Sequence, residues 1–149
     1  MRLTCGITTG HSPAHSERAD FRAHCFTAAR MIGGNVVNFD DDPPYYQSFI
    51  YEVISTPSGS VKILLNLAGQ CLAFAKYPHV EFTVLHEFID HDRLADAFKV
   101  LGTYRVLTPS DLLTPLSACD LNELALIELK DIRYWKPTCL GELLFNYWD

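Results

Sequence analysis

The segment from His86 to His91 reads His-Glu-Phe-Ile-Asp-His and comes close to a zinc-binding motif. The H-E-x-x-H motif of metalloproteases places two histidines four residues apart on one face of a helix, with the glutamate as base. Here the histidines are five residues apart, which turns the second imidazole away from the first. We therefore interpret the segment as a strand end followed by a helix N-cap at Asp90.

His11 and His15 are four residues apart, and His24 follows about two helical turns later. Two histidines on one helical face can bind a metal ion. However, Ser12 and Pro13 resemble an N-cap and first helical residue, so the helix begins between the two histidines. Nearby carboxylates and cysteines do not complete a third ligand at a diagnostic interval. We expect a polar helix start here, and neither a metal nor a cofactor.

Gly6 and Gly10 lie between an expected strand over residues 2–8 and the first helix. This order resembles a phosphate-binding loop, but the segment lacks the lysine of a P-loop and the third glycine of a dinucleotide fingerprint. Nucleophilic catalysis has equally little support, because Cys25 and Cys71 fall on apolar segments where burial raises the pKa of a thiol. A tight connection is the favoured interpretation, and a small phosphoester site is the alternative.

Carboxylates beside aromatic residues form the remaining polar clusters. An acidic triplet precedes two prolines and two tyrosines in a loop, and two further aspartates flank His91. A solvated loop is the simpler interpretation, but acidic rims around aromatic anchors also suit a protein interface. The candidate partner-binding residues are Asp40, Asp41, Asp42, Tyr45, Tyr46, Asp90 and Asp92.

The apolar periodicity of the chain predicts helices and strands in a mixed order. We expect helices over 13–32, after Asp90, after a capping box formed by Asp120 and Glu123, and after Thr138, with a short helical turn over 108–111. Strands are expected over 35–39, 46–56, 61–67, 70–75, 80–84 and 104–107. Together they predict an α+β fold in one domain over residues 1–149, with helices packed on a mostly antiparallel mixed sheet of about five to six strands and a helical C-terminus.

The composition narrows the functional classes. The net charge is −6, which disfavours direct binding to nucleic acid or anionic lipid and favours encounter with a basic partner. There is neither an apolar run long enough for a membrane span nor the apolar core of a secretory signal. Five scattered cysteines are typical of reduced thiols. We therefore expect a cytoplasmic protein.

The segment Arg133–Asp149 resembles the closing motif of small bacterial immunity proteins from polymorphic toxin and contact-dependent growth inhibition systems. The stretch Val61–Phe74, with Leu64-Leu65-Asn66 before an apolar strand, fits the same resemblance. It implies a cytoplasmic protein that binds and blocks one cognate toxin domain, often a basic nuclease, without catalytic residues of its own.

The expected function is therefore neutralisation of a toxin domain by occlusion, without catalysis. Two alternatives stay open: a small cytosolic enzyme acting on a nucleotide or phosphoester, and a regulatory module that binds another protein.

Overall fold

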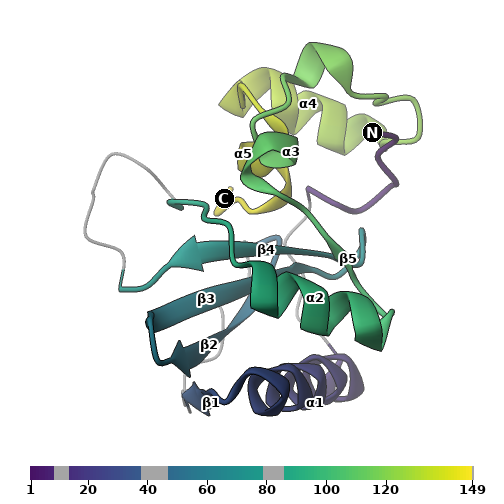
Figure 1. Cartoon of the computed structure of the whole chain (residues 1–149). Helices are drawn as coiled ribbons and strands as arrows, with labels where there is room; N and C mark the ends of the chain where they lie inside the picture. Colours follow the sequence, from purple (N-terminus) through teal and green to yellow (C-terminus); the bar gives the residue numbers. More distant parts are fainter. Residues whose placement is uncertain (9–13, 38–46, 79–85, 149) are drawn as a thin grey trace.

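The computed structural model describes residues 1–8, 14–37, 47–78 and 86–148. Figure 1 shows the elements coloured along the chain. They are α1 (His15–Ile32), β1 (Asn35–Val37), β2 (Ile50–Thr56), β3 (Gly59–Asn66), β4 (Cys71–Lys76), α2 (Asp92–Leu101), β5 (Arg105–Val106), α3 (Pro109–Leu112), the 3₁₀ helix η1 (Leu116–Ala118), α4 (Leu126–Trp135) and α5 (Leu140–Leu144).

The described strands form one five-stranded sheet in the order β1-β2-β3-β4-β5. Neighbouring strands are antiparallel except β4 and β5, which pair in parallel. The predicted α+β class, with a mostly antiparallel mixed sheet and C-terminal helices, is confirmed. The strand predicted over residues 80–84 lies outside the described residues. None of the described helices is long and apolar enough to span a lipid bilayer.

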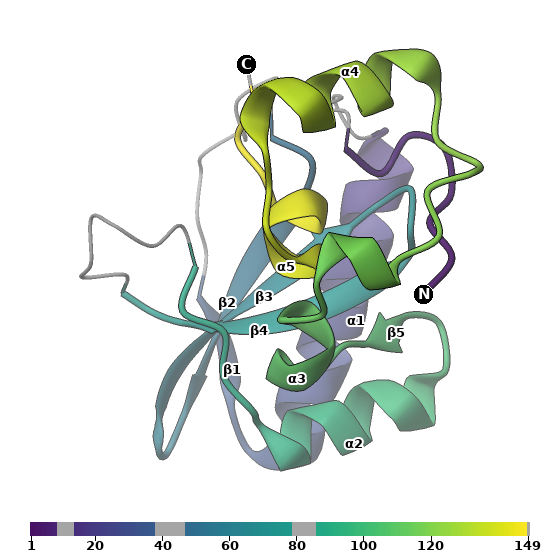
Figure 2. The same ribbon diagram turned by 90° about the horizontal axis from the view of Figure 1, so that it is seen from above.

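Helices cover both faces of the sheet, with α1 and α2 on one face and α3, α4 and α5 on the other (Figures 1 and 2). Strand β3 is buried on both faces: Ile63 and Leu65 belong to the core under α1 and α2, and Leu64 to the core under the C-terminal helices. A strand between two helical layers needs apolar residues at consecutive positions, which explains the unbroken Ile63-Leu64-Leu65 run.

Helix α1 matches its prediction closely. Phe21, Cys25 and Ala28 recur at helical spacing and are buried on one side of the helix. Gly33 ends the helix with a φ of 75°, a conformation that glycine adopts without strain. The helix starts after Ala14, while the expected cap, Ser12, lies outside the described residues.

The strand predicted over residues 2–8 is wrong. Arg2 makes only an isolated bridge to Asp120, and residues 5–8 form turns. The amides of Gly6 and Thr8 instead donate to the carboxylate of Glu128, at 3.0 and 3.1 Å. Because these amides have a side-chain acceptor, they need no partner strand.

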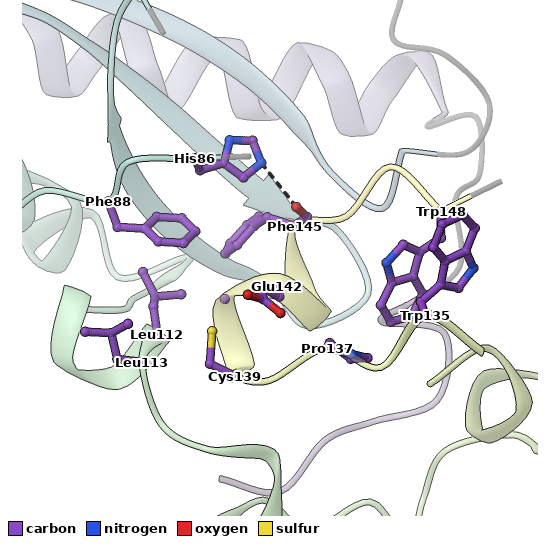
Figure 3. Close-up of a pocket in the computed structure, with 11 residues that line it drawn as sticks. His86, Phe88, Leu112, Leu113, Trp135, Pro137, Cys139, Glu142, Phe145 and Trp148 are labelled. Atoms are coloured by element: carbon purple, nitrogen blue, oxygen red, sulfur yellow. Dashed lines mark hydrogen bonds between the residues drawn. The ribbon is translucent and has the colours of Figure 1, made fainter. Parts of the chain in front are cut away.

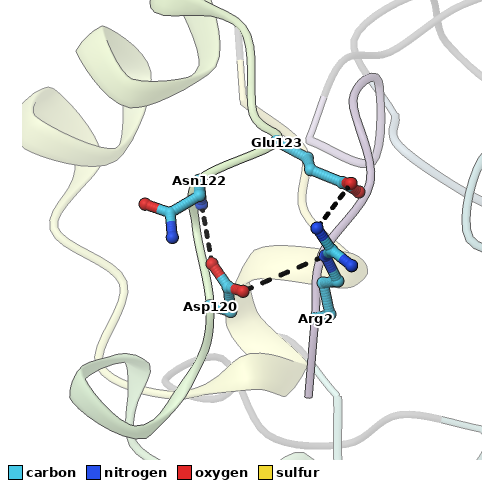
Figure 4. A network of polar contacts seen from close by, with 4 residues as sticks. All are labelled: Arg2, Asp120, Asn122 and Glu123. Atoms are coloured by element: carbon cyan, nitrogen blue, oxygen red, sulfur yellow. Dashed lines mark hydrogen bonds and ion pairs between the residues drawn. The ribbon is translucent and has the colours of Figure 1, made fainter.

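The capping box predicted at Asp120 and Glu123 is also wrong. Helix α4 begins after Ala125, and its third residue, Glu128, accepts a hydrogen bond from the Ala125 amide at 2.9 Å. Asp120 instead accepts from the amide of Asn122 at 3.0 Å, and Glu123 pairs with Arg2 at 3.1 Å (Figure 4). These groups are largely exposed, so the ion pair contributes little to stability.

Two other helix starts differ from the prediction by one residue. His91, not Asp90, caps α2, because its Nδ1 accepts from the Leu94 amide at 3.2 Å. The last helix starts after Cys139, not Thr138, and the amide of Thr138 donates to Glu142 at 2.8 Å.

Glu128 is the buried anion that ties the N-terminal loop to α4. Its side chain is almost inaccessible, and it accepts from the amides of Ala125, Gly6 and Thr8 and from the Thr8 hydroxyl. Burial raises the pKa of this carboxyl group, and the four hydrogen bonds together lower it by more than burial raises it. The resulting pKa lies below the ordinary value of 4.5. The hydrogen-bond donors thus stabilise the charged carboxylate in its buried position.

We predict that Glu128→Gln lowers the free energy of unfolding by about 1–3 kcal/mol at neutral pH, because the amide group meets fewer of these donors. A carboxyl group with a lowered folded pKa stabilises the protein above its unfolded pKa and loses that effect as the pH falls through the folded value. The difference from the parent protein should therefore shrink below about pH 4.5. Urea unfolding at several pH values measures it, with Glu123→Gln as the exposed control, and a pH-independent difference would contradict the assignment.

Candidate functional site

A pocket of about 400 Å³ opens on the face covered by the C-terminal helices (Figure 3). It lies between the connection from β4 to α2, helices α3 and α5, and the C-terminal end of α4. The lining residues are His86, Phe88, Leu112, Leu113, Trp135, Pro137, Cys139, Gly141, Glu142, Phe145 and Trp148. Most of these side chains are apolar or aromatic, as in pockets that bind small ligands or protruding side chains.

Aromatic rings form two walls of the pocket. On one side, Trp135 and Trp148 are stacked, with ring planes only 4° apart and centroids 6.3 Å apart. On the other side, the ring of Phe88 lies 6.0 Å from Phe145 and 5.7 Å from His86. Figure 3 shows the tryptophan pair and the rings of Phe88 and Phe145 on different sides of the lining.

Gly141 makes the phenylalanine wall possible. A Cβ atom at this position would lie 2.7 Å from Cε2 of Phe88 and 3.2 Å from the carbonyl oxygen of Leu112. Real side chains do not approach this closely. The ring of Phe88 therefore rests directly on the backbone of α5, and the missing side chain defines part of the pocket.

Two polar side chains of the pocket are held by the backbone around them. His86 is buried, and its Nε2 lies 3.1 Å from the carbonyl oxygen of Phe145. Since a carbonyl only accepts, Nε2 carries a proton and donates it. Glu142 is exposed and accepts from the amide and the hydroxyl of Thr138, at 2.8 and 3.2 Å. Among the described lining residues it is the only carboxylate.

This arrangement suits binding better than acid–base catalysis. The Nε2–H of His86 is engaged with a backbone carbonyl, and the carboxylate of Glu142 holds the start of α5. In the part of the chain that the structure describes, every buried side-chain nitrogen and oxygen has a hydrogen-bond partner. The polar groups thus fix the walls, and the aromatic rings supply the contact surface.

Among the predicted partner-binding residues, the structure describes Asp90 and Asp92, and neither lines this pocket. Asp90 and Asp92 are exposed at the start of α2 and border a separate shallow cleft with His91, Asp96 and Lys99. Asp40, Asp41, Asp42, Tyr45 and Tyr46 lie outside the described residues.

The other histidines give no further support to a metal site. His24 is engaged by the Asp20 carbonyl at 2.7 Å and the Thr103 hydroxyl at 2.8 Å. His11 and the side chain of His15 lie outside the described residues. Within residues 1–8, 14–37, 47–78 and 86–148, no three His, Cys, Asp or Glu side chains come together as metal ligands would.

The glycine loop and the buried cysteines serve the fold. The amides of Gly6 and Thr8 already bind an internal anion, Glu128, so they are not available to a phosphate. Burial raises the pKa of the Cys71 thiol to about 12 and that of Cys25 well above its ordinary value. The expected burial of both thiols is confirmed, and a raised thiol pKa lowers the fraction of reactive thiolate.

Sequence reasoning missed most of this pocket. The aromatic ending was conspicuous, but only the fold reveals that Trp148 stacks on Trp135 and that His86 and Phe88 line the same pocket. A usable signal was Glu142 three residues after the N-cap Cys139, the position from which a carboxylate reaches back to a helix start.

The chain matches no protein-family model, and neither a curated protein nor a solved structure shows significant similarity to it. Function is therefore inferred from the pocket itself and from the sequence.

We predict that Gly141→Ala destabilises the protein by about 1–3 kcal/mol and alters the pocket, because the added methyl group must displace Phe88. Urea unfolding measures the loss of stability, and near-ultraviolet circular dichroism reports the aromatic packing. Ser110→Ala, at an exposed position of α3, serves as the control and should stay within about 0.5 kcal/mol of the parent. An unchanged unfolding curve for Gly141→Ala would contradict the prediction, because it would show that Phe88 moves without a loss of stability.

Proposed function

We propose that this chain is an immunity protein that binds one cognate bacterial toxin domain and neutralises it by occlusion. The observation that carries the proposal is which part of the sequence lines the pocket. The segment that resembles the ending of immunity proteins supplies most of the lining, including Trp135, Glu142 and Trp148. The most distinctive part of the sequence thus lines an apolar and aromatic pocket.

The exposure of these aromatic residues supports a role in protein binding. Trp135 and Tyr147 are 41% and 38% exposed, although both lie beside apolar surface that could cover them. Tryptophan and tyrosine are enriched among the residues that dominate the binding energy of protein interfaces. Large aromatic anchors around a concave centre are what an occluding inhibitor requires.

The local charge selects one side of the molecule as the contact surface. Glu142 lies in the pocket and Asp111 on the neighbouring helix α3, and both are exposed. This surface, together with the net charge of −6, favours the approach of a basic partner such as a nuclease toxin.

The outer face of α4 has the opposite character. Leu126 and Tyr134 are exposed there beside Lys130 and Arg133. Positive charge on this helix would repel a basic toxin. We therefore assign toxin contact to the pocket side and not to the outer face of α4.

Neutralisation needs no bond to be made or broken in this proposal. A tight complex places the pocket side over the toxin and excludes its substrate, so that one inhibitor molecule blocks one toxin molecule. Rigid walls reduce the ordering cost of association. The hydrogen bonds between His86 and the carbonyl oxygen of Phe145 and between Thr138 and Glu142 hold these walls in place.

The proposal is tested by co-expression with the product of a neighbouring toxin-like reading frame. We expect a stable complex of nanomolar affinity, worth roughly −12 kcal/mol. Trp148→Ala should weaken it by about 30-fold or more, the effect of losing a strong anchor of about 2 kcal/mol.

Val100→Ala is the matched control, because Val100 is 75% exposed on α2 under the opposite face of the sheet. It should bind like the parent protein. Absence of a toxin-like neighbour, or failure of the chain to protect cells that produce one, would contradict the proposed function.

A further inference from the structure

We propose that the pocket receives an arginine side chain of the partner. This inference rests on the proposed function in taking the pocket as the contact site. It adds the chemical nature of the side chain that occupies the pocket, which is a planar cation that stacks on the tryptophans and pairs with Glu142.

The first argument is the charge of the lining. Among the described lining residues, Glu142 carries the only carboxylate, and neither lysine nor arginine is present. A single negative charge within aromatic walls is unfavourable to an anionic ligand and favourable to a cation. Near the lining, the exposed Asp111 adds one negative charge, and the exposed Lys136, between Trp135 and Pro137, adds one positive charge. The preference for a cation therefore rests on Glu142 inside the pocket.

The second argument is the aromatic surface. The face of a tryptophan ring attracts a cation more strongly than that of phenylalanine or tyrosine. Trp135 and Trp148 form a parallel pair with an interplanar angle of 4°, so the pair presents flat surfaces of one orientation. Flat surfaces suit the planar guanidinium group, which stacks on aromatic rings, better than the compact ammonium group of lysine.

The third argument is the hydrogen-bonding capacity of Glu142. Its two oxygens each accept one hydrogen bond from Thr138, at 2.8 and 3.2 Å. A carboxylate oxygen has two acceptor sites, so each retains one. Thr138 thus fixes the direction of the carboxylate, and each remaining site can accept one N–H donor of a guanidinium group in a charge-assisted hydrogen bond.

The size of the pocket agrees with this ligand. Its volume of about 400 Å³ lies in the range of pockets that accommodate small ligands. The apolar side chains of Leu112, Leu113 and Phe88 can cover the aliphatic stem of an arginine while Glu142 binds its head. An uncharged aromatic side chain would also fill such a volume, and the experiment below separates the two.

Tryptophan fluorescence provides a selective measurement, because the chain contains only two tryptophans and both line the pocket. The intact protein is titrated with a short peptide that is neutral except for one arginine, and with matched peptides that carry citrulline, lysine or phenylalanine instead. Citrulline keeps the shape of arginine and removes its charge. We expect a saturable change in the millimolar range, with arginine bound about tenfold or more tightly than citrulline.

Two variants localise the effect. Glu142→Gln should remove the preference for arginine over citrulline, whereas Glu123→Gln, which changes an exposed carboxylate outside the pocket, should leave it unchanged. Far-ultraviolet circular dichroism confirms that both variants are folded. The comparison of arginine with citrulline on the parent protein needs no variant, so it decides the case even if Glu142→Gln unfolds.

Equal affinity for arginine and citrulline, tighter binding of the phenylalanine peptide, or no saturable change would each overturn the inference. These outcomes are distinct from failure of the proposed function. A protein that neutralises a toxin but ignores the arginine peptide would retain the function and lose the arginine site. A protein that binds the peptide but has no toxin partner would retain the site and lose the function.

Discussion

The structure depends on two buried asparagine side chains that connect the ends of the chain. Asn66, at the end of β3, donates to the carbonyl oxygens of Ile7 and Leu144, each at 2.8 Å. Asn146 donates to Thr8 at 3.2 Å and to Leu143 at 2.8 Å. The N-terminal loop has no regular structure, and a buried backbone without partners is costly. These amides, with Glu128, supply the partners, so the loop and α5 can both lie against the sheet.

The pocket inherits its rigidity from this network. The Oδ1 atom of Asn146 accepts a hydrogen bond from the amide of Trp148 at 3.1 Å, which fixes the backbone just beyond α5. From there the Trp148 ring reaches Trp135 at the end of α4, and α4 is in turn anchored through Glu128. One wall of the pocket is therefore held at both of its ends by buried hydrogen bonds. Such a preformed wall needs little ordering when a partner binds.

The sequence predicted what local patterns determine. The extent of α1 and its end before Gly33 follow from periodicity and backbone preference, and both were predicted correctly. The start of α4 was not, because the pairs Asp120–Glu123 and Ala125–Glu128 have the same spacing. Glu128 prevails because the amides of Gly6 and Thr8, about 120 positions away in the chain, complete its shell. The pocket could not be predicted from the sequence either, since its walls come from segments that are distant along the chain.

The resemblance of the C-terminal segment can be divided by what each residue does. Leu140, Leu143 and Asn146 are buried, and any protein with this packing would need similar residues whatever its function. Trp135 and Glu142 differ, because both remain exposed and packing alone does not require a tryptophan or a carboxylate at such positions. Large exposed aromatic side chains around a concavity have a cost in solubility, so their presence favours a partner that covers them. Under the proposed function, the exposed residues of this segment contact the partner, and its buried residues hold them in position.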